Sequence, residues 1–440
     1  MTTRIHIIHA GNMNNKGTQA LLSSDVLVLR EIVKNELSIS VSTTDVEGVK
    51  RLNLPIAAVL PTLLDVPYEK ADRLTKRFRI PRSSAKYKVF AVYALLLFFA
   101  QTMLTLASLV LRKFRLPGIY RKEIFERIRE SDLVLSCSDE NFKETASLLP
   151  LNVYWILTWW SMLFERTVEI LVAKSFGKPV VMLPNSVGPF RTWIGRFLSR
   201  LALNKCSAII VRDPISYGIV EKLGINCRKY LTSDMALLFK PRKEEITESV
   251  DHPLIGVCPG IYSFSVSKHE IERYVTGHAR ALDAAIEKHG VRILFLPHYV
   301  SGFEYDDFEI SQLILESMKN KEHGRILKVN SLDDFKLMIN KMDLVVSSKM
   351  HPAVLAVSGY VPAVSVVYDH KQTGFFKDLG LSEYTVRLQH ASGDELFLKI
   401  DKAWSNRKEI IGLLKARVPQ LQETVRNTVK IAIAPFVNCK

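Results

Sequence analysis

The sequence predicts an α/β protein with two Rossmann-like domains, each built on a parallel sheet. Short apolar runs alternate with segments of helical periodicity along most of the chain, which is typical of parallel strands joined by helices. The 440 residues are enough for two domains with full cores. A polar and charged segment at 240–253 separates two groups of these units, as a linker between domains does.

The domain boundaries follow from this segment. We expect a first domain at 1–240, a second at 250–395, and amphipathic helices at 396–440 that pack back on the first domain. The apolar runs predict strands of the first domain at 5–9, 131–136, 178–183, 208–211 and 229–231. They predict strands of the second domain at 254–258, 291–296, 326–329, 344–346 and 362–367, with helices at 269–289, 308–318 and 332–340.

The loop after the first strand, GNMNNKG at 11–17, is rich in glycine and asparagine. It precedes a helix expected at 18–33, so its backbone N–H groups are a candidate ligand contact, with Asn12, Asn15 and Gly17 as binding residues. The GxGxxG spacing of a dinucleotide site is absent. The alternative is an ordinary turn, in which the asparagines supply only backbone geometry.

The segment DLVVSSKMHPAVLAVSGYVPAVSVVYDHK at 343–371 reads as strand, polar turn, helix, glycine turn and strand. Lys349 and His351 fall where the first strand ends and the helix begins, and Pro352 suits the first helical turn. Ligands of parallel sheets bind at this end of the strands, and the N–H groups of a helix start favour an anion. We therefore predict a phosphate or carboxylate site here, with Lys371 as a further cation.

Composition limits the possible partners. The net charge of +15 implies acidic partners, which are phosphates, anionic lipid or nucleic acid. The sequence has no basic run interleaved with aromatic residues, so nucleic acid is not expected. The five cysteines are odd in number and none are paired at ligand spacing, so we expect neither a disulfide framework nor a zinc site. With no long apolar run at its start, the chain is expected to be cytoplasmic.

An apolar stretch at 89–111 contains 23 residues without a charge. Basic segments at 73–88 and at 112–115 flank it. The stretch is long enough to span a bilayer, but positive charge at both ends favours two cytoplasmic ends. We therefore expect a helix or helical hairpin in the inner leaflet, which makes the protein peripheral or monotopic at an anionic membrane surface. The alternative for 89–111 is a buried core helix. The aromatic run at 154–160 could lie either at the membrane interface or in the core.

Six blocks in order carry a resemblance to a known family: GNMNNKGTQALL (11–22), SDLVLSCSDENFKE (131–144), PVVMLPNSVGPF (179–190), VRDPISYGIVEKLGI (211–225), SDMALLF (233–239) and 343–381. Together they resemble the polysaccharide pyruvyltransferase family. The resemblance implies a GT-B-like fold with the site in the cleft between the domains. It also implies transfer of pyruvate from phosphoenolpyruvate, as a ketal, to a sugar of a cell-surface polysaccharide or its lipid-linked precursor. Neither a cofactor nor a metal is expected.

The resemblance also implies roles for individual residues. Arg212 and His351 match the arginine and histidine that the family uses around phosphoenolpyruvate. Ketal formation needs a proton on the enol methylene carbon, and a histidine near its usual pKa suits that transfer, so His351 is the expected general acid. The cations expected to hold the donor are Arg212, Lys349 and Lys371, although Arg212 could instead pair with Asp213 or Asp234.

A carboxylate is expected to act as base. The candidates are Asp139, Glu140 and Asp234, and the sequence does not rank them. Asp234 is also a predicted substrate-binding residue, together with His298 at the end of a strand in the second domain.

Two positions depart from the family pattern. Lys349 replaces an arginine, and Cys137 to Asp139 replace a glycine-rich turn. Two other functions therefore stay open, a GT-B glycosyltransferase that uses a nucleotide sugar and an inactive membrane-associated scaffold.

Overall fold

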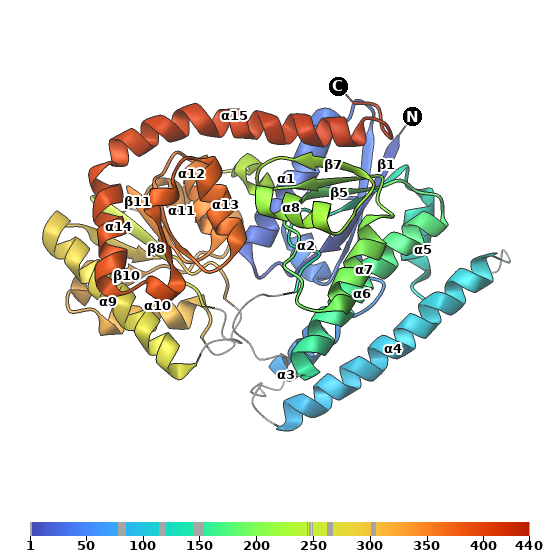
Figure 1. The fold of residues 1–440 in the computed structure, drawn as a ribbon, viewed down its shortest axis with the longest axis horizontal. Coiled ribbons are helices and arrows are strands. Elements are labelled where there is room, and N and C mark those ends of the chain that lie inside the picture. The colour runs from blue at the N-terminus through green and yellow to red at the C-terminus, as the bar shows by residue number, and fades with distance from the viewer. Residues whose placement is uncertain are drawn as a thin grey trace.

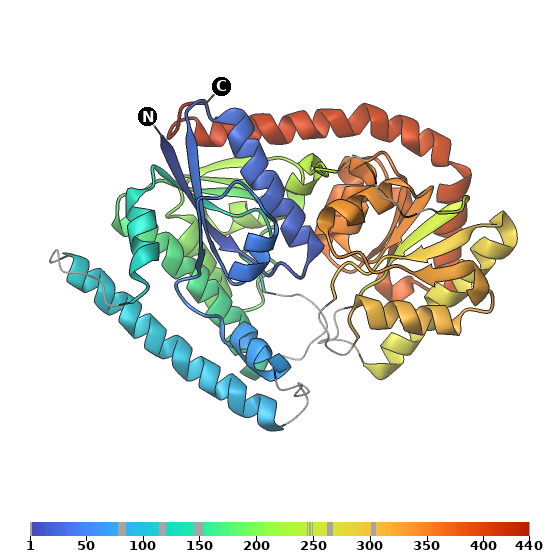
Figure 2. The same cartoon turned by 180° about the vertical axis from the view of Figure 1, so that it is seen from behind.

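The computed structural model describes residues 2–439 apart from 78–84, 114–119, 145–152, 244, 246, 247, 249, 262–266 and 301–304. The described chain forms two α/β lobes, each with helices on both faces of a parallel sheet, and a long C-terminal helix runs along both (Figure 1). This is the two-domain, Rossmann-like fold that the sequence predicts. A view from behind shows the two termini close together on the first lobe (Figure 2).

The first sheet has seven parallel strands in the order β3-β2-β1-β4-β5-β6-β7. Their bounds are β1 Thr3–Ala10, β2 Leu37–Thr43, β3 Ala58–Pro61, β4 Leu133–Ser136, β5 Val180–Asn185, β6 Ala208–Val211 and β7 Arg228–Leu231. The sequence missed β2 and β3. In β2 every second residue is a serine or threonine, which breaks the apolar run that marks a buried strand. Two of these serines, Ser40 and Ser42, are buried because their hydroxyls bond the two ring nitrogens of His6, at 2.7 and 2.9 Å.

The second sheet has six parallel strands in the order β10-β9-β8-β11-β12-β13. Their bounds are β8 Leu254–Cys258, β9 Arg292–Phe295, β10 Gly324–Ile326, β11 Leu344–Ser347, β12 Ala363–Val367 and β13 Thr385–Arg387. The strand expected at 326–329 begins two residues earlier, and the short β13 was not predicted. Both lie at edges of the sheet, where a strand buries less apolar surface and leaves a weaker pattern.

Helices cover both sheets. In the first domain they are α1 Lys16–Ile32, α2 Val46–Arg51, α3 Pro67–Arg77, α4 Ala85–Lys113, α5 Lys122–Glu130, α6 Val153–Ser175, α7 Trp193–Leu203, α8 Pro214–Lys222 and the short η1 Met235–Leu238. The remaining helices are α9 Lys268–His289, α10 Asp307–Ser317, η2 Lys321–His323, α11 Leu332–Asn340, α12 Met350–Ser358, α13 His370–Asp378, η3 Ser382–Tyr384, η4 Leu388–His390, α14 Gly393–Ser405 and α15 Arg407–Ile433.

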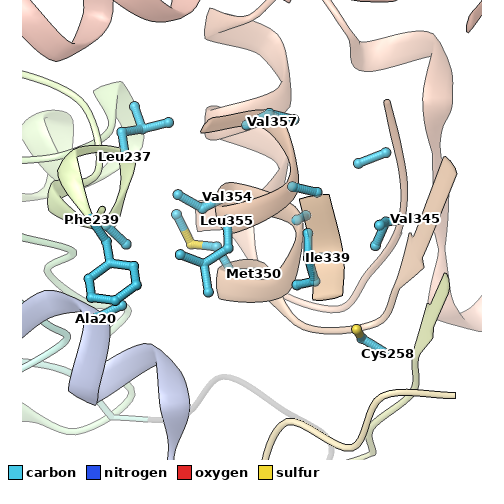
Figure 3. Packing of buried hydrophobic residues seen from close by; sticks show 14 of the residues in the cluster. Ala20, Leu237, Phe239, Cys258, Ile339, Val345, Met350, Val354, Leu355 and Val357 are labelled. Carbon is cyan, nitrogen blue, oxygen red and sulfur yellow. The ribbon is translucent and has the colours of Figure 1, made fainter. Parts of the chain in front are cut away.

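An apolar contact joins the two domains behind the predicted site. The side chains of Val354 and Leu355 on α12 face Leu237 of η1 and Ala20 of α1 (Figure 3). Eight of the nine residues of α12, from Met350 to Val357, are buried. The helix therefore packs on its own sheet and on the first domain at once. Because His351 lies in the first turn of α12, this contact determines where the imidazole lies.

The C-terminal region forms two helices, α14 and α15, the first of which begins three residues before the expected 396. Helix α14 packs on α9, and α15 then crosses to the first domain, where it contacts β5, β6 and β7 (Figure 1). The chain end is held there by a hydrogen bond of 2.9 Å from the N–H of Lys34 to the carbonyl of Asn438.

The apolar stretch at 89–111 forms a single continuous helix, α4, so a helical hairpin is wrong. A buried core helix is also wrong, because Val89 and Met103 are 69% and 65% exposed. Among the described residues, α4 is the one helix that is long and apolar enough to cross a membrane. Of the predicted flanking residues, Arg79, Arg82 and Arg115 lie outside the described part of the chain. The same holds for the side chains of Arg73, Lys76, Arg77, Arg112 and Lys113 and for those of 154–158 in the aromatic run.

The interdomain contact predicts a stability effect. Leu237→Ala should lower the free energy of unfolding by about 2–5 kcal/mol, because it removes a fully buried side chain and leaves a cavity against α12. Urea denaturation followed by circular dichroism measures this. Leu398→Ala, at a position that is 57% exposed, is the control and should change the free energy by less than about 0.5 kcal/mol. Equal effects of the two substitutions would contradict the packing described here.

Candidate active site

The loop between β1 and α1 lies against the second domain. Asn15 caps α1 by accepting a hydrogen bond from the N–H of Gly17 at 2.9 Å, and Asn12 accepts one within the loop at 2.8 Å. The backbone of Asn15 also pairs with that of Tyr299 across the domain junction. A Cβ at Gly17 would lie 2.1 Å from Nδ1 of His351, so this position requires glycine. The two asparagine side chains therefore shape the loop, and Gly17 allows the start of α1 to approach the imidazole.

Three cations surround one carboxylate at the same junction. Glu140 follows β4 in the first domain, and its Oε1 accepts a hydrogen bond of 3.3 Å from Nη2 of Arg212. Lys143 and Lys371 also form ion pairs with Glu140. Lys371 comes from α13, so this pair links the two domains. All four side chains are at most 12% exposed, and burial lowers the pKa of Lys371 to about 8. An anion that took the place of Glu140 would meet all three cations, since each of them contacts this carboxylate.

Arg212 is held from three directions. Its Nη1 donates to Asp234 at 2.7 Å and its Nε donates to the hydroxyl of Ser186 at 2.8 Å, in addition to the contact with Glu140. The expected alternative partner, Asp213, instead caps α8 by accepting from the N–H of Ser216 at 2.7 Å. Asp234 is therefore a partner of Arg212 and a cap of η1, which orients the guanidinium and leaves the carboxylate little capacity to act as a base.

His351 and His298 lie side by side. Their ring centroids are 6.4 Å apart and their planes differ by 17°. Both rings are buried, and among the described residues neither nitrogen of His298 nor Nε2 of His351 has a hydrogen-bond partner. Burial lowers the pKa of both rings, and for His351 the nearby carboxylate of Asp234 only partly opposes this. The sequence-based expectation that His351 has a pKa near its usual value is thus wrong, because its helix is buried on both sides.

A second ionic group lies beyond His298. Lys349 donates to Asp307 at 2.7 Å, and the same carboxylate accepts hydrogen bonds from the N–H groups of His298 and Tyr299. Lys16, at the start of α1, is buried nearby, and its pKa is lowered by burial and partly restored by Asp307. Lys349 therefore does not contact the cluster around Glu140, and the two imidazoles lie between the two groups of charge.

The turn after β4 contains Cys137 to Asp139, where the resemblance implied a glycine-rich turn. Asp25 of α1 accepts hydrogen bonds from the N–H and hydroxyl of Ser138, at 2.9 and 2.6 Å, and from the thiol of Cys137 at 3.3 Å. The side chains of Cys137 and Ser138 thus bond a helix of the first domain, whereas Asp139 lies near the cations and His351 at the junction. Asp139 accepts one long hydrogen bond, 3.5 Å from Thr18, so it is the least engaged of the three candidate bases.

Sequence reasoning missed three members of this site. Lys143 lies inside the block SDENFKE and Lys16 inside the first loop, so the signal was present but neither cation was distinguished from a surface lysine. Asp307 was missed because it begins a helix, where an acidic residue is expected for helix stability alone.

A cavity of about 240 Å³ lies elsewhere between the domains. Met13, Gln19, Arg51, Arg242 and Asp333 are among the residues that line it, and it contains none of the site residues predicted from the sequence. Within the described ranges, no three histidine, cysteine or acidic side chains are grouped as metal ligands.

The fold and the position of the site identify the class of protein. Two parallel-sheet domains with functional groups at the carboxyl ends of facing strands are the GT-B arrangement. The chain is similar to a putative UDP-N-acetylglucosamine 2-epimerase from Listeria monocytogenes, with a TM-score of 0.56 and 12% identity over 98% of this chain and 95% of that one. It is equally similar to the UDP-GlcNAc 2-epimerase of Methanocaldococcus jannaschii, with a TM-score of 0.56 and 11% identity over 99% of this chain and all of that one. At these identities the likeness concerns the fold alone.

The family follows from the sequence comparison. Residues 58–370 match the model of the polysaccharide pyruvyl transferase family, and the chain belongs to that family. The match includes Arg212, Asp234, His298, Lys349 and His351, and it ends one residue before Lys371. The amylovoran biosynthesis protein AmsJ of Erwinia amylovora is 23% identical over 266 residues, which are 56% of this chain and 62% of AmsJ. The match thus spans less than two thirds of that relative.

The charge cluster predicts an anion effect. Glu140→Gln should lower the free energy of unfolding by about 3–5 kcal/mol, because it leaves three buried cations without their shared carboxylate. Inorganic phosphate should restore more stability to this variant than to the wild type, since it can take the vacated position. Thermal unfolding across a phosphate series measures both effects.

The matched control is Glu383→Gln, which removes a half-exposed partner of Lys402. It should cost less than about 1 kcal/mol and should not respond to phosphate. An equal response of both variants to phosphate would contradict an anion site at Glu140.

The carboxyl of Asp25 predicts a pH effect on stability. Burial raises its pKa to about 7 in the folded chain, above its value of about 3.9 when unfolded. The stability from the protonated carboxyl is therefore fully present below about pH 4 and is lost as the pH rises through 7. In Asp25→Asn the free energy of unfolding should fall less between pH 4 and 8, by an amount on the order of a few kcal/mol. The free energy of unfolding is measured by urea denaturation at each pH. If it changed with pH by the same amount in the variant and in the wild type, the assignment would be contradicted.

Proposed function

We propose that the protein transfers pyruvate, as a ketal, from phosphoenolpyruvate to a sugar of a cell-surface polysaccharide or of its lipid-linked precursor. Family membership favours this reaction over nucleotide-sugar transfer and over an inactive scaffold. The observation that carries the proposal is the buried group of Arg212, Lys143 and Lys371 at the domain junction. Two of its members, Arg212 and Lys143, are close enough to His351 to influence its pKa. Such a group suits a donor with a phosphate and a carboxylate.

The donor would displace the carboxylate of Glu140 from these cations. Arg212 suits this role because Asp234 and Ser186 hold two edges of its guanidinium, so that the remaining Nη2 edge faces Glu140. The fork geometry of a guanidinium matches a carboxylate or phosphate. Lys143 and Lys371 add positive charge from the two domains, so that a bound donor would hold the domains together.

His351 would supply the proton. Burial lowers its pKa, so the imidazole is mostly neutral at pH 7 until a donor binds. The negative charge of the donor raises that pKa, and the imidazolium can then protonate the methylene carbon of the enol. The central carbon becomes electrophilic and is attacked by one sugar hydroxyl. Phosphate then leaves, and the neighbouring hydroxyl closes the ketal.

Two hydroxyl protons are released in this sequence. One restores the imidazolium of His351, and the other leaves with phosphate after passing through a base. Asp139 is the candidate base, because Glu140 and Asp234 are both bound to cations. With a lipid-linked acceptor, this reaction takes place at the inner face of the cell membrane.

The proposal predicts the effect of removing the imidazole. His351→Ala should lower kcat for phosphate release from phosphoenolpyruvate by about 10²–10⁴-fold, the usual contribution of a general acid. The measurement is phosphate release with a lipid-linked or polymeric acceptor. His390→Ala, at an exposed histidine of the second domain, is the control and should keep wild-type activity. Wild-type turnover by His351→Ala would remove this residue from the mechanism, and stabilisation by UDP but not by phosphoenolpyruvate would favour the nucleotide-sugar reaction.

A further inference from the structure

Helix α4 has its apolar face on the outside of the protein. Most of its large apolar side chains are 40–69% exposed, and these are Val89, Val92, Tyr93, Leu96, Phe99, Met103, Leu104, Leu106 and Val110. The spacing of three and four residues from Val89 to Val110 places the series on one side of the helix. Both views of the fold show α4 along the outer edge of the first domain (Figures 1 and 2).

The opposite side of α4 is tied to the domain by polar contacts. Gln101 accepts a hydrogen bond of 2.7 Å from the N–H of Asp65 and donates one of 3.1 Å to its carboxylate. The same carboxylate pairs with Arg121 at 3.0 Å, and the hydroxyl of Ser108 accepts from the N–H of Tyr120 at 3.1 Å. The inner side also buries Tyr87, Ala94 and Phe98, so it combines polar and apolar contacts with the domain. The outer side is apolar over the same length and has no such partner among the described residues.

These inner contacts argue against a membrane span. A spanning α4 would leave the folded domain, expose Gln101 to lipid and strip Asp65 of two hydrogen bonds. An in-plane position keeps every one of these contacts and buries only the outer face.

The charges of α4 indicate what covers that face. Lys86 and Lys88 at its start are exposed, Arg112 and Lys113 form its end, and the helix contains no acidic residue. If the face bound the same helix of a second copy, in parallel or antiparallel order, a basic end would meet a basic end. An anionic lipid surface has the complementary charge at both ends.

We propose that α4 lies in the plane of an anionic membrane, with its outer apolar face in the boundary between headgroups and acyl chains and its basic ends on the headgroups. The inference deepens the proposed function, since it places the protein where a lipid-linked acceptor is found. Membrane binding of this kind needs neither donor nor acceptor, so each proposal can fail without the other.

The test is sedimentation of the 440-residue chain with vesicles of phosphatidylglycerol and phosphatidylcholine. The double variant Leu96→Glu and Met103→Glu should lower partitioning by roughly tenfold or more, because it places two charges on the buried face. High salt should weaken binding of the wild type, since the basic ends act through charge. The matched control, Leu398→Glu and Ile431→Glu, changes two apolar residues that are each 57% exposed on other helices, and it should bind as the wild type does.

Several results would overturn the proposal. Two of them are failure of the wild type to sediment with the vesicles and binding of the α4 variant as strong as that of the control. Resistance of the cellular protein to alkaline carbonate extraction would indicate a spanning helix instead. A dimer in analytical ultracentrifugation that the α4 variant dissolves would assign the face to a second copy. Thermal unfolding of each variant, which should match the wild type because the changed residues are exposed, separates a binding defect from misfolding.

Discussion

The apolar contact of α12 with α1 and η1 is the constraint on which the rest of the site depends. Leu237 and Ala20 of the first domain meet Val354 and Leu355 of the second, so the two domains share one continuous core (Figure 3). Burial of this surface is favourable at roughly 25 cal/mol per Å², which makes the junction more than a loose encounter of two lobes. Because His351 begins α12, the same packing brings its imidazole to the start of α1.

The charges at the domain junction determine what kind of ligand can bind there. Buried cations are costly unless they are paired, and Arg212, Lys143, Lys371 and Lys349 all pair with internal carboxylates. Glu140 serves Arg212, Lys143 and Lys371, whereas Asp307 serves Lys349. In the first group three cations share the one carboxylate of Glu140, and one of these pairs joins the domains. It is therefore the group in which an external anion can replace an internal one.

Part of this site could be read from the chain and part could not. The end of β11 and the end of β6 marked His351 and Arg212, because polar residues after an apolar run lie at the ligand edge of a parallel sheet. Lys349 lies at the same edge and yet faces Asp307. The pattern predicts the helix that Asp307 begins, but it does not say which side chains of other elements that helix will meet. In β2, buried serines that bond His6 concealed a central strand from the apolar pattern.

The sequence by itself determined most of the strands, the division into two domains and the family, because periodicity and local motifs are properties of neighbouring residues. It also determined that α4 is helical and uncharged over most of its length. Only the tertiary structure decided which charges meet, how far burial lowers the pKa of His351, and that α4 turns its apolar side outward. These depend on contacts between residues far apart in the chain, and burial in such contacts is set by the packing of whole elements.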